Sequence, residues 1–254
     1  MDELAGLRAT DVTVAYGGVV ANDSVSVRVD PGRVVGLIGP NGAGKTTFID
    51  ALTGFAPAVG LMTVDGARVD GLPAFRRRRQ GLARTWQAGE LFSSLSILEN
   101  VLVASDHVGW GTALLDLVGR RHDNRRVALR TLKRVGLDGY ADATPEEMSL
   151  GLQRLVGVAR ALAGDPRVLL LDEPAAGLDS LDSQSLGRAI REVADSGVAV
   201  LLIEHDMELI FGVCDQIVVL DFGRVIYSGD PGGARKDAAV LSAYLGAAPL
   251  REEQ

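Results

Sequence analysis

One short segment constrains the fold of this chain more than any other part of the sequence. Residues 39–47 read GPNGAGKTT and match the pattern GxxxxGK[ST]. The apolar run RVVGLI at 33–38 comes directly before this segment, and the helical pattern TTFIDALTG, which ends at Gly54, comes directly after its glycines. A strand, a glycine-rich turn and a helix in this order predict an α/β fold with a phosphate-binding site where the strand ends.

The residue types of this phosphate loop suit a polyphosphate. Glycines let the backbone curl so that successive N–H groups point at phosphate oxygens, and the helix adds the positive end of its dipole. We expect Lys45 to reach the β- and γ-phosphates and the Thr46 hydroxyl to ligate Mg²⁺. A chance match to the pattern has a probability of only ~0.4%. The predicted phosphate ligands are Gly39, Pro40, Asn41, Gly42, Ala43, Gly44, Lys45, Thr46 and Thr47.

A second apolar strand ends in two carboxylates. The run VLLLDEP at 168–174 places Asp172 at the end of the strand and Glu173 one residue beyond it. We expect Asp172 to hold the metal through water and Glu173 to polarise the attacking water as general base. A solvated acidic turn is the alternative for such a pair alone, and the phosphate loop in the same chain favours the catalytic interpretation.

The order of these and further motifs resembles the ATP-binding cassette (ABC) family. The resemblance extends from about residue 7 to residue 246. It implies a chain that binds ATP with Mg²⁺ and hydrolyses it. Besides the phosphate loop and the carboxylate pair, the motifs are Gln87 in GLARTWQ, MSLGLQR at 148–154, AGLDS at 176–180 and His205 in LLIEHDM.

The resemblance also implies roles for single residues. Gln87 would contact Mg²⁺ or the attacking water, and His205 would hydrogen-bond the γ-phosphate. Tyr16 in VAYGG matches the aromatic residue that stacks on adenine, with a tyrosine buried in the edge sheet as the alternative. Asp179 would lie at the interface with a partner cassette. The implied catalytic residues are Glu173, His205 and Gln87, and the implied metal ligands are Thr46, Gln87 and Asp172.

The signature-like segment implies a dimer. Ser149 and Gly151 open a helix whose N-terminus suits an anion, and by the resemblance they serve the ATP of a second cassette. Leu150 and Leu152 replace a glycine and the glutamine of the common LSGGQ. Because leucine donates no side-chain hydrogen bond, we hypothesise a heterodimer in which the site completed by this signature is the weaker one.

The fold class implied by the resemblance is α/β. It is a P-loop NTPase (RecA-like) core with an antiparallel β edge subdomain and an inserted α-helical subdomain. The chain would be one ABC ATPase domain over 1–254, with an α/β lobe at 1–87 and 164–254 and a helical lobe at 88–163.

Local patterns agree with this organisation. Val12 and Val14, then Val25 and Val27, alternate with polar residues on either side of a glycine turn, which predicts an antiparallel pair. The other predicted elements are a capping box of Ser96 with Glu99, a helix from near Leu181, buried strands at 168–171 and 198–203, a hairpin of 216–220 with 222–228, and a short helix at 238–245.

Within the family, the sequence is most similar to ATP-binding subunits of branched-chain amino-acid importers. The segments that carry this similarity are GLARTWQ with LFSSLSILENVLVAS, then DEPAAGLD, then LLIEHDMELIFGVCDQIVVLDFGRVIYSGDP. A urea or short-amide importer is the near alternative. DNA-repair and translation-type cassettes are more distant ones, because the chain shows no sustained heptad and only one set of motifs.

Partners follow from the same resemblance. A cassette without a membrane span would work with a second ATPase subunit, two integral membrane permease subunits and, indirectly, an extracytoplasmic solute-binding protein. A short permease helix would dock between Gln87 and the helical segment, at Leu91, Phe92 and Leu95, for which ordinary core is the alternative. The run RRRR at 76–79 could face anionic lipid, but a solvated charge run is favoured.

Composition narrows the setting. The formal net charge of −7 disfavours generic binding to nucleic acid. The only cysteine, Cys214, excludes an internal disulfide and is expected in the core. Apolar runs are strand-sized, so neither a signal peptide nor a membrane span is expected. The expected location is therefore peripheral, on the cytoplasmic face of the inner membrane.

Overall fold

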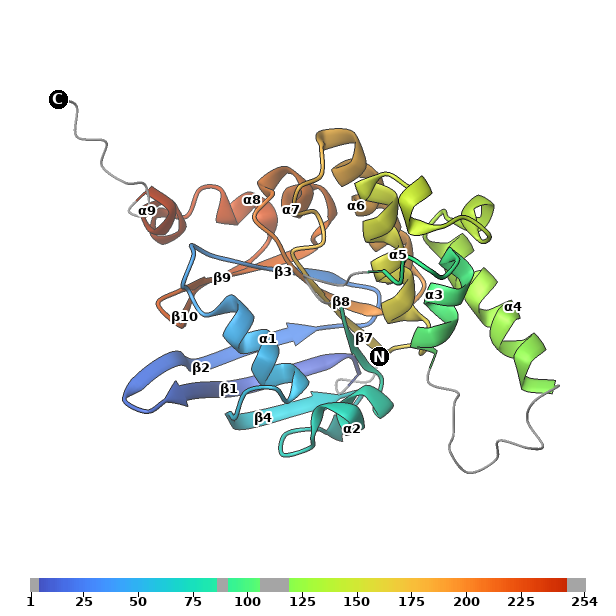
Figure 1. The fold of residues 1–254 in the computed structure, drawn as a ribbon. Coiled ribbons are helices and arrows are strands. Elements are labelled where there is room, and N and C mark those ends of the chain that lie inside the picture. The colour runs from blue at the N-terminus through green and yellow to red at the C-terminus, as the bar shows by residue number, and fades with distance from the viewer. Residues whose placement is uncertain (1–4, 86–90, 106–118, 246–254) are drawn as a thin grey trace.

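The structure is a computed structural model that describes residues 5–85, 91–105 and 119–245. Two β-sheets pack with helices around them (Figure 1). The smaller sheet and α1 (Lys45–Thr53) cover one face of the larger sheet, where they share a core around Phe48 and Leu201. Helices from the second half of the chain cover the opposite face, in a second core around Leu171 and Ile190. The larger sheet is therefore buried on both faces.

The smaller sheet is antiparallel, in the order β2-β1-β4-β5. Val12 and Val14 are fully buried on its inner face, which confirms the predicted N-terminal strand pair. The third and fourth strands, β4 and β5, were not predicted from the sequence, because Gly60 interrupts β4 and β5 is only two residues long. The bounds are β1 (Leu7–Tyr16), β2 (Val19–Val29), β4 (Val59–Val64) and β5 (Ala67–Arg68).

The larger sheet has the order β10-β9-β3-β8-β7-β6. All its strands are parallel except β10, which pairs antiparallel with β9. Every residue of β3, β7 and β8 is buried, as the apolar runs predict for a sheet covered on both faces. The bounds are β3 (Val34–Ile38), β6 (Leu82–Arg84), β7 (Val168–Asp172), β8 (Ala199–Ile203), β9 (Gln216–Asp221) and β10 (Arg224–Gly229).

Three helices gather at one end of the molecule and bury a shared apolar face (Figure 1). Each of the three helices contributes buried residues to this face, for example Ile97, Leu132 and Leu155. All three residues lie within the stretch expected to be helical. The predicted capping box is present, since Ser96 N–H donates to Glu99 Oε2 at 2.8 Å. The bounds are α3 (Ile97–Ala104), α4 (Gly119–Arg134) and α5 (Leu150–Leu162), with 3₁₀ turns at Asp138–Tyr140 and Pro145–Glu147.

The remaining helices follow the α/β rhythm. The helix predicted from near Leu181 and the short C-terminal helix are both present. The other two escaped the sequence analysis because each spans no more than two turns. The bounds of these four helices are α6 (Ser180–Asp195), α7 (Met207–Val213), α8 (Pro231–Ala234) and α9 (Ala238–Leu245). In the part of the chain that the structure describes, every helix is too short or too polar to cross a bilayer.

The run of four arginines forms α2 (Ala74–Arg79), another short helix that the sequence analysis missed. The expectation of a solvated charge run is wrong for Arg77, which is 5% exposed. Its Nη1 donates to Ala51 O at 2.7 Å and to Leu52 O at 2.8 Å, so it satisfies carbonyls at the C-terminus of α1. A guanidinium can donate to two carbonyls at once. These hydrogen bonds explain why a charged side chain is buried here.

Candidate nucleotide site

The phosphate loop connects the end of β3 to the start of α1. Gly39 and Gly44 have φ angles of 150° and 98°, which other residues rarely adopt. A Cβ at Gly39 would stand 2.1 Å from Leu220 O, and one at Gly44 would stand 2.6 Å from Ala21 O. Glycine is therefore required at both positions, and the loop backbone packs against neighbouring strands while its outer side remains open at Gly42.

Lys45 lies across this loop. Its Nζ donates to Gly39 O at 2.7 Å and to Pro40 O at 2.9 Å, and the residue is 6% exposed. Burial lowers the pKa of Lys45, while the charges of Glu173 and Asp172 act in the opposite direction and raise it. The ammonium group thus lies between the phosphate loop and the carboxylates. Its N–H groups can donate to phosphate oxygens in place of the two carbonyl oxygens.

Glu173 and His205 lie at the carboxyl ends of adjacent parallel strands. Asp172 pairs with Ile203 at the ends of β7 and β8, so the residues that follow leave the sheet side by side. His205 Nε2 and Glu173 Oε1 are 2.7 Å apart. The side chains are 45% and 20% exposed, so both reach solvent at this edge of the sheet.

Glu204, which the sequence analysis did not single out, supports this pair. It is 4% exposed, and its carboxylate accepts hydrogen bonds from Ala175 N–H at 2.5 Å and His205 N–H at 3.0 Å. Burial raises the pKa of Glu204 more than these backbone donors lower it. The side chain ties the loop after β7 to the loop after β8. Its signal in the sequence was a carboxylate directly after a buried apolar run.

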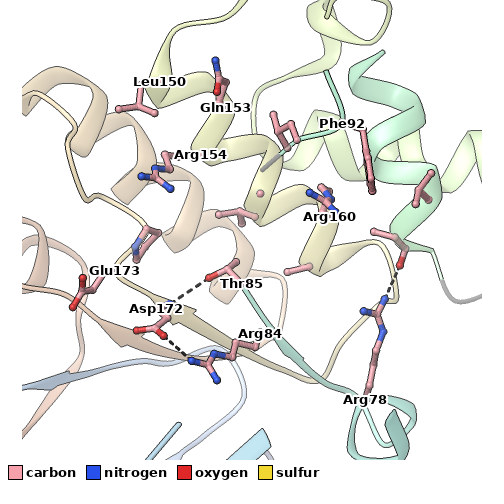
Figure 2. A pocket seen from close by; sticks show the side chains of 17 residues that line it. Arg78, Arg84, Thr85, Phe92, Leu150, Gln153, Arg154, Arg160, Asp172 and Glu173 are labelled. Carbon is pink, nitrogen blue, oxygen red and sulfur yellow. Dashed lines mark hydrogen bonds and ion pairs between the residues drawn. The ribbon is translucent and has the colours of Figure 1, made fainter. Parts of the chain in front are cut away.

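Asp172 is paired with a residue that the sequence analysis also missed. Arg84 Nη2 donates to Asp172 Oδ2 at 2.8 Å (Figure 2). Asp172 N–H donates to Thr85 Oγ1 at 3.2 Å, which secures the backbone at the same point. We expected Asp172 to hold a metal through water, and the structure shows that one of its oxygens already serves an ion pair. The signal for Arg84 was a charged residue inside a strand-like run.

The signature residues begin α5. Ser149 is its N-cap, and Ser149 Oγ accepts from Leu152 N–H at 3.3 Å. Gly151 packs against α6, since a Cβ there would stand 2.3 Å from Asp182 Cγ. Leu150 is 45% exposed beside them. The predicted helix N-terminus is present, with a leucine on its surface.

Asp179 caps the next helix. Its Oδ1 accepts from Leu181 N–H at 3.0 Å and Asp182 N–H at 2.9 Å. Leu181 is 75% exposed. The side chain of Asp179 is thus occupied within its own chain, at a surface that carries an exposed apolar residue.

The structure describes two further predicted residues, Tyr16 and Thr46. Tyr16 ends β1 and is 51% exposed, so the alternative of a buried tyrosine is wrong. Thr46, in the first turn of α1, is exposed. Gln87 lies outside the described residues.

A groove of about 540 Å³ runs from Asp172 and Glu173 to the helical end of the molecule (Figure 2). Phe92 is 47% exposed in it and stacks on Arg160, whose guanidinium carbon lies 5.4 Å from the ring centre. Arg78 Nη2 donates to Ala104 O at 2.6 Å on the same side. The expected apolar cluster is therefore partly exposed at Phe92.

The donor set fits a magnesium nucleotide. Hydroxyl and carboxylate oxygens are the ligands that Mg²⁺ prefers, and Thr46 and Asp172 supply them from α1 and β7. The phosphate loop is open at Gly42, where nothing stands within 4 Å of an added Cβ. The residues present can therefore hold both the phosphates and the metal.

Known proteins resemble the chain over almost its full length. A family model described as ABC transporter matches residues 22–176. The chain is 37% identical over 250 residues to the high-affinity branched-chain amino acid transport ATP-binding protein BraF of Pseudomonas aeruginosa, covering 95% of this chain and 98% of that protein. It is 36% identical over 251 residues to LivG of Escherichia coli, a protein of the same description, with the same coverage.

Solved structures agree. The ADP conformation of an ATP-binding cassette of an ABC transporter aligns with a TM-score of 0.84 and 26% identity, over 94% of this chain and 98% of that one. A dimeric bacterial ABC transporter cassette aligns with a TM-score of 0.73 and 26% identity, over 89% and 98%. Motif order, fold and these similarities confirm the predicted resemblance: the chain belongs to the ABC transporter family, as an ATP-binding cassette.

Proposed function

We propose that this chain is the ATP-hydrolysing subunit of an importer for branched-chain amino acids. The proposal of ATP hydrolysis rests on the contact of Glu173 with His205, next to an intact phosphate loop. The solute rests on the names of the similar proteins BraF and LivG. Those names do not favour a urea or amide importer, nor a DNA-repair or translation cassette.

The phosphate loop and Lys45 bind the ATP phosphates. The loop N–H groups and the N-terminus of α1 supply a field that favours negative charge. Lys45 exchanges its two carbonyl partners for phosphate oxygens, a stronger charge-assisted contact. Tyr16, exposed at the end of β1, stacks on the adenine.

Glu173 is the general base. Its carboxylate accepts the proton of the attacking water, and the 2.7 Å contact with His205 Nε2 keeps it oriented. His205 also hydrogen-bonds the γ-phosphate when ATP is present. Thr46, Asp172 and Gln87 hold Mg²⁺, which when bound neutralises charge on the phosphates.

A second cassette completes each site. Ser149 and Gly151 at the start of α5 serve the ATP bound by the partner, with Asp179 at the interface. The dimeric cassette among the solved structures supports this assembly. We retain the heterodimer hypothesis, and equal turnover by both composite sites in a comparison of single-site variants would count against it.

The assembly would sit on the cytoplasmic face of the membrane. Two permease subunits supply the pore, and an extracytoplasmic solute-binding protein delivers the cargo. We place the docking site of a short permease helix in the groove at Phe92, which Glu173 and residues of α3 and α5 also line. In this proposal the helical lobe spans 88–163 and the α/β lobe spans 1–87 and 164–254.

Reconstitution tests this proposal. The chain is co-expressed with its neighbouring permease, cassette and binding-protein genes, purified and placed in liposomes that contain ATP. We expect uptake of labelled leucine, isoleucine and valine, and no uptake with Glu173→Gln. Uptake of urea or amides alone would overturn the solute, and ATP turnover that no permease affects would overturn the transport function.

A further inference from the structure

Arg84 joins two carboxylates that lie far apart in the sequence. Its Nη2 donates to Asp172 Oδ2 at 2.8 Å, and its Nη1 donates to Asp50 Oδ1 at 2.5 Å. The side chains of Arg84 and Asp172 are only 8% and 3% exposed, and that of Asp50 is 33% exposed. One guanidinium therefore bridges α1 and β7 inside the protein. Figure 2 shows the arm that reaches Asp172.

The bridge joins the two elements that carry the proposed metal ligands. Asp50 lies on α1, one helical turn after Thr46, so the two share a face of the helix. Asp172 is the last residue of β7. Arg84 thus contacts both of the elements that carry the proposed metal ligands.

We propose that Arg84 is a positioning residue for the Mg²⁺ site, which fixes the Asp172 carboxylate relative to Thr46. The inference rests on the proposed function, because it takes Thr46 and Asp172 as metal ligands. Arg84 occupies one oxygen of Asp172 and leaves the other to face the metal or its water. Outer residues that hold a ligand in this way typically change metal affinity by about 10- to 100-fold when they are removed.

Arginine suits this role better than lysine. Its planar fork donates in two fixed directions, whereas an ammonium is a single centre. The Thr85 contact reaches only the backbone of Asp172, whereas Arg84 contacts its carboxylate directly. A role in stability alone is the weaker explanation, since buried ion pairs contribute little net stability compared with apolar residues.

The test measures metal binding without turnover. Mn²⁺, which prefers the same oxygen ligands as Mg²⁺, is titrated into the full-length protein with bound ADP, and free Mn²⁺ is followed by electron paramagnetic resonance. We expect Arg84→Met to weaken Mn²⁺ binding by about 10- to 100-fold. ADP affinity in EDTA should change much less. Arg84→Lys should recover part of the loss.

Two further variants complete the design. Asp50→Asn removes the charge from the partly exposed arm of the bridge and so weakens it, and we expect an intermediate loss of Mn²⁺ affinity even if Arg84→Met does not fold. Arg167→Met is the matched control, since Arg167 makes an exposed ion pair with Asp65 and should leave Mn²⁺ affinity unchanged.

The outcomes separate the inference from the proposed function. Unchanged Mn²⁺ affinity in folded Arg84→Met or Asp50→Asn, with or without lower stability, overturns the positioning role and leaves the proposed function intact. If wild-type protein with ADP binds Mn²⁺ no more tightly than ADP alone, the proposed metal site is wrong and the inference falls with it.

Discussion

Glu173 Oε1 and His205 Nε2 lie 2.7 Å apart, although the two residues follow different strands. The contact exists because β7 and β8 are adjacent and end in register, with Asp172 opposite Ile203. Glu173 has a positive φ of 48°, a backbone conformation that few residues adopt without support. The bond from Glu173 N–H to Ile203 O, at 2.9 Å, provides that support.

Replacing the base tests the centre of the site. We expect Glu173→Gln to keep ATP binding and to lower turnover by about 10²- to 10⁴-fold, since glutamine cannot accept the proton of water. Steady-state phosphate release and calorimetric ATP titration measure the two effects. Glu208→Gln, at an exposed position two residues after Asp206, is the control, and unchanged turnover in Glu173→Gln would contradict the assignment.

Removing the loop lysine tests nucleotide binding. Lys45→Ala should weaken ATP binding by about 10- to 100-fold, because a charge-assisted contact to phosphate is lost. Calorimetry at low ionic strength provides the measurement, with Lys133→Ala in α4 as a control for loss of one positive charge. Equal ATP affinity in Lys45→Ala and wild type would show that Lys45 does not contact the phosphates.

Asp215 makes stability depend on pH. Burial alone would raise the pKa of Asp215, but hydrogen bonds from Val34 N–H, Arg191 and Arg33 outweigh it and hold the pKa below its ordinary value. A lowered folded-state pKa stabilises the protein above the pKa of the unfolded state, and this contribution is lost as pH falls through the folded-state value.

We therefore expect Asp215→Asn to lower the free energy of unfolding by about 1–3 kcal/mol at neutral pH, and by less in acid. Urea denaturation at several pH values measures the difference. Asp195→Asn is the comparison, since Asp195 shares Arg191 but is 65% exposed. A loss for Asp215→Asn that is independent of pH would contradict the linkage.

The arginine run offers an internal control for helix capping. Arg77→Ala leaves two buried carbonyls of α1 without their donor and should cost about 1–3 kcal/mol in the free energy of unfolding. Arg76→Ala, at the exposed neighbouring position, should change it by less than about 0.5 kcal/mol. Chemical denaturation of both variants decides the point, and equal losses would refute the capping role.

The sequence predicted those parts of the fold that depend on local pattern. The strands β3, β7 and β8 were recognisable because a sheet covered on both faces requires continuous apolar runs. The capping box of Ser96 with Glu99 and the phosphate loop were recognisable because their chemistry depends on fixed short spacings. Elements of two turns or fewer, such as α2 and α7, carried too little pattern to identify.

Side chains whose partners are distant in the chain were beyond such patterns. The sequence predicts Arg77 at the surface, whereas its contacts with Ala51 and Leu52 place it in the interior. Arg84 and Glu204 were missed for the same reason, because their sequence signals mark an unusual charge but do not identify its distant partners, which lie 29 or more residues away at Ala175, Asp50 and Asp172. The order of the strands decides which loops meet, and only the folded chain contains that order.

The sequence by itself determined the chemistry of this protein: a phosphate loop, two carboxylates after a strand, and the family to which these motifs belong. The tertiary structure alone decided how those groups are held, with His205 against Glu173 and with Arg84 between Asp50 and Asp172. The physical reason is that residue types and short spacings are local properties, whereas an ion pair or hydrogen bond across a sheet requires backbone packing to bring its partners within about 3 Å.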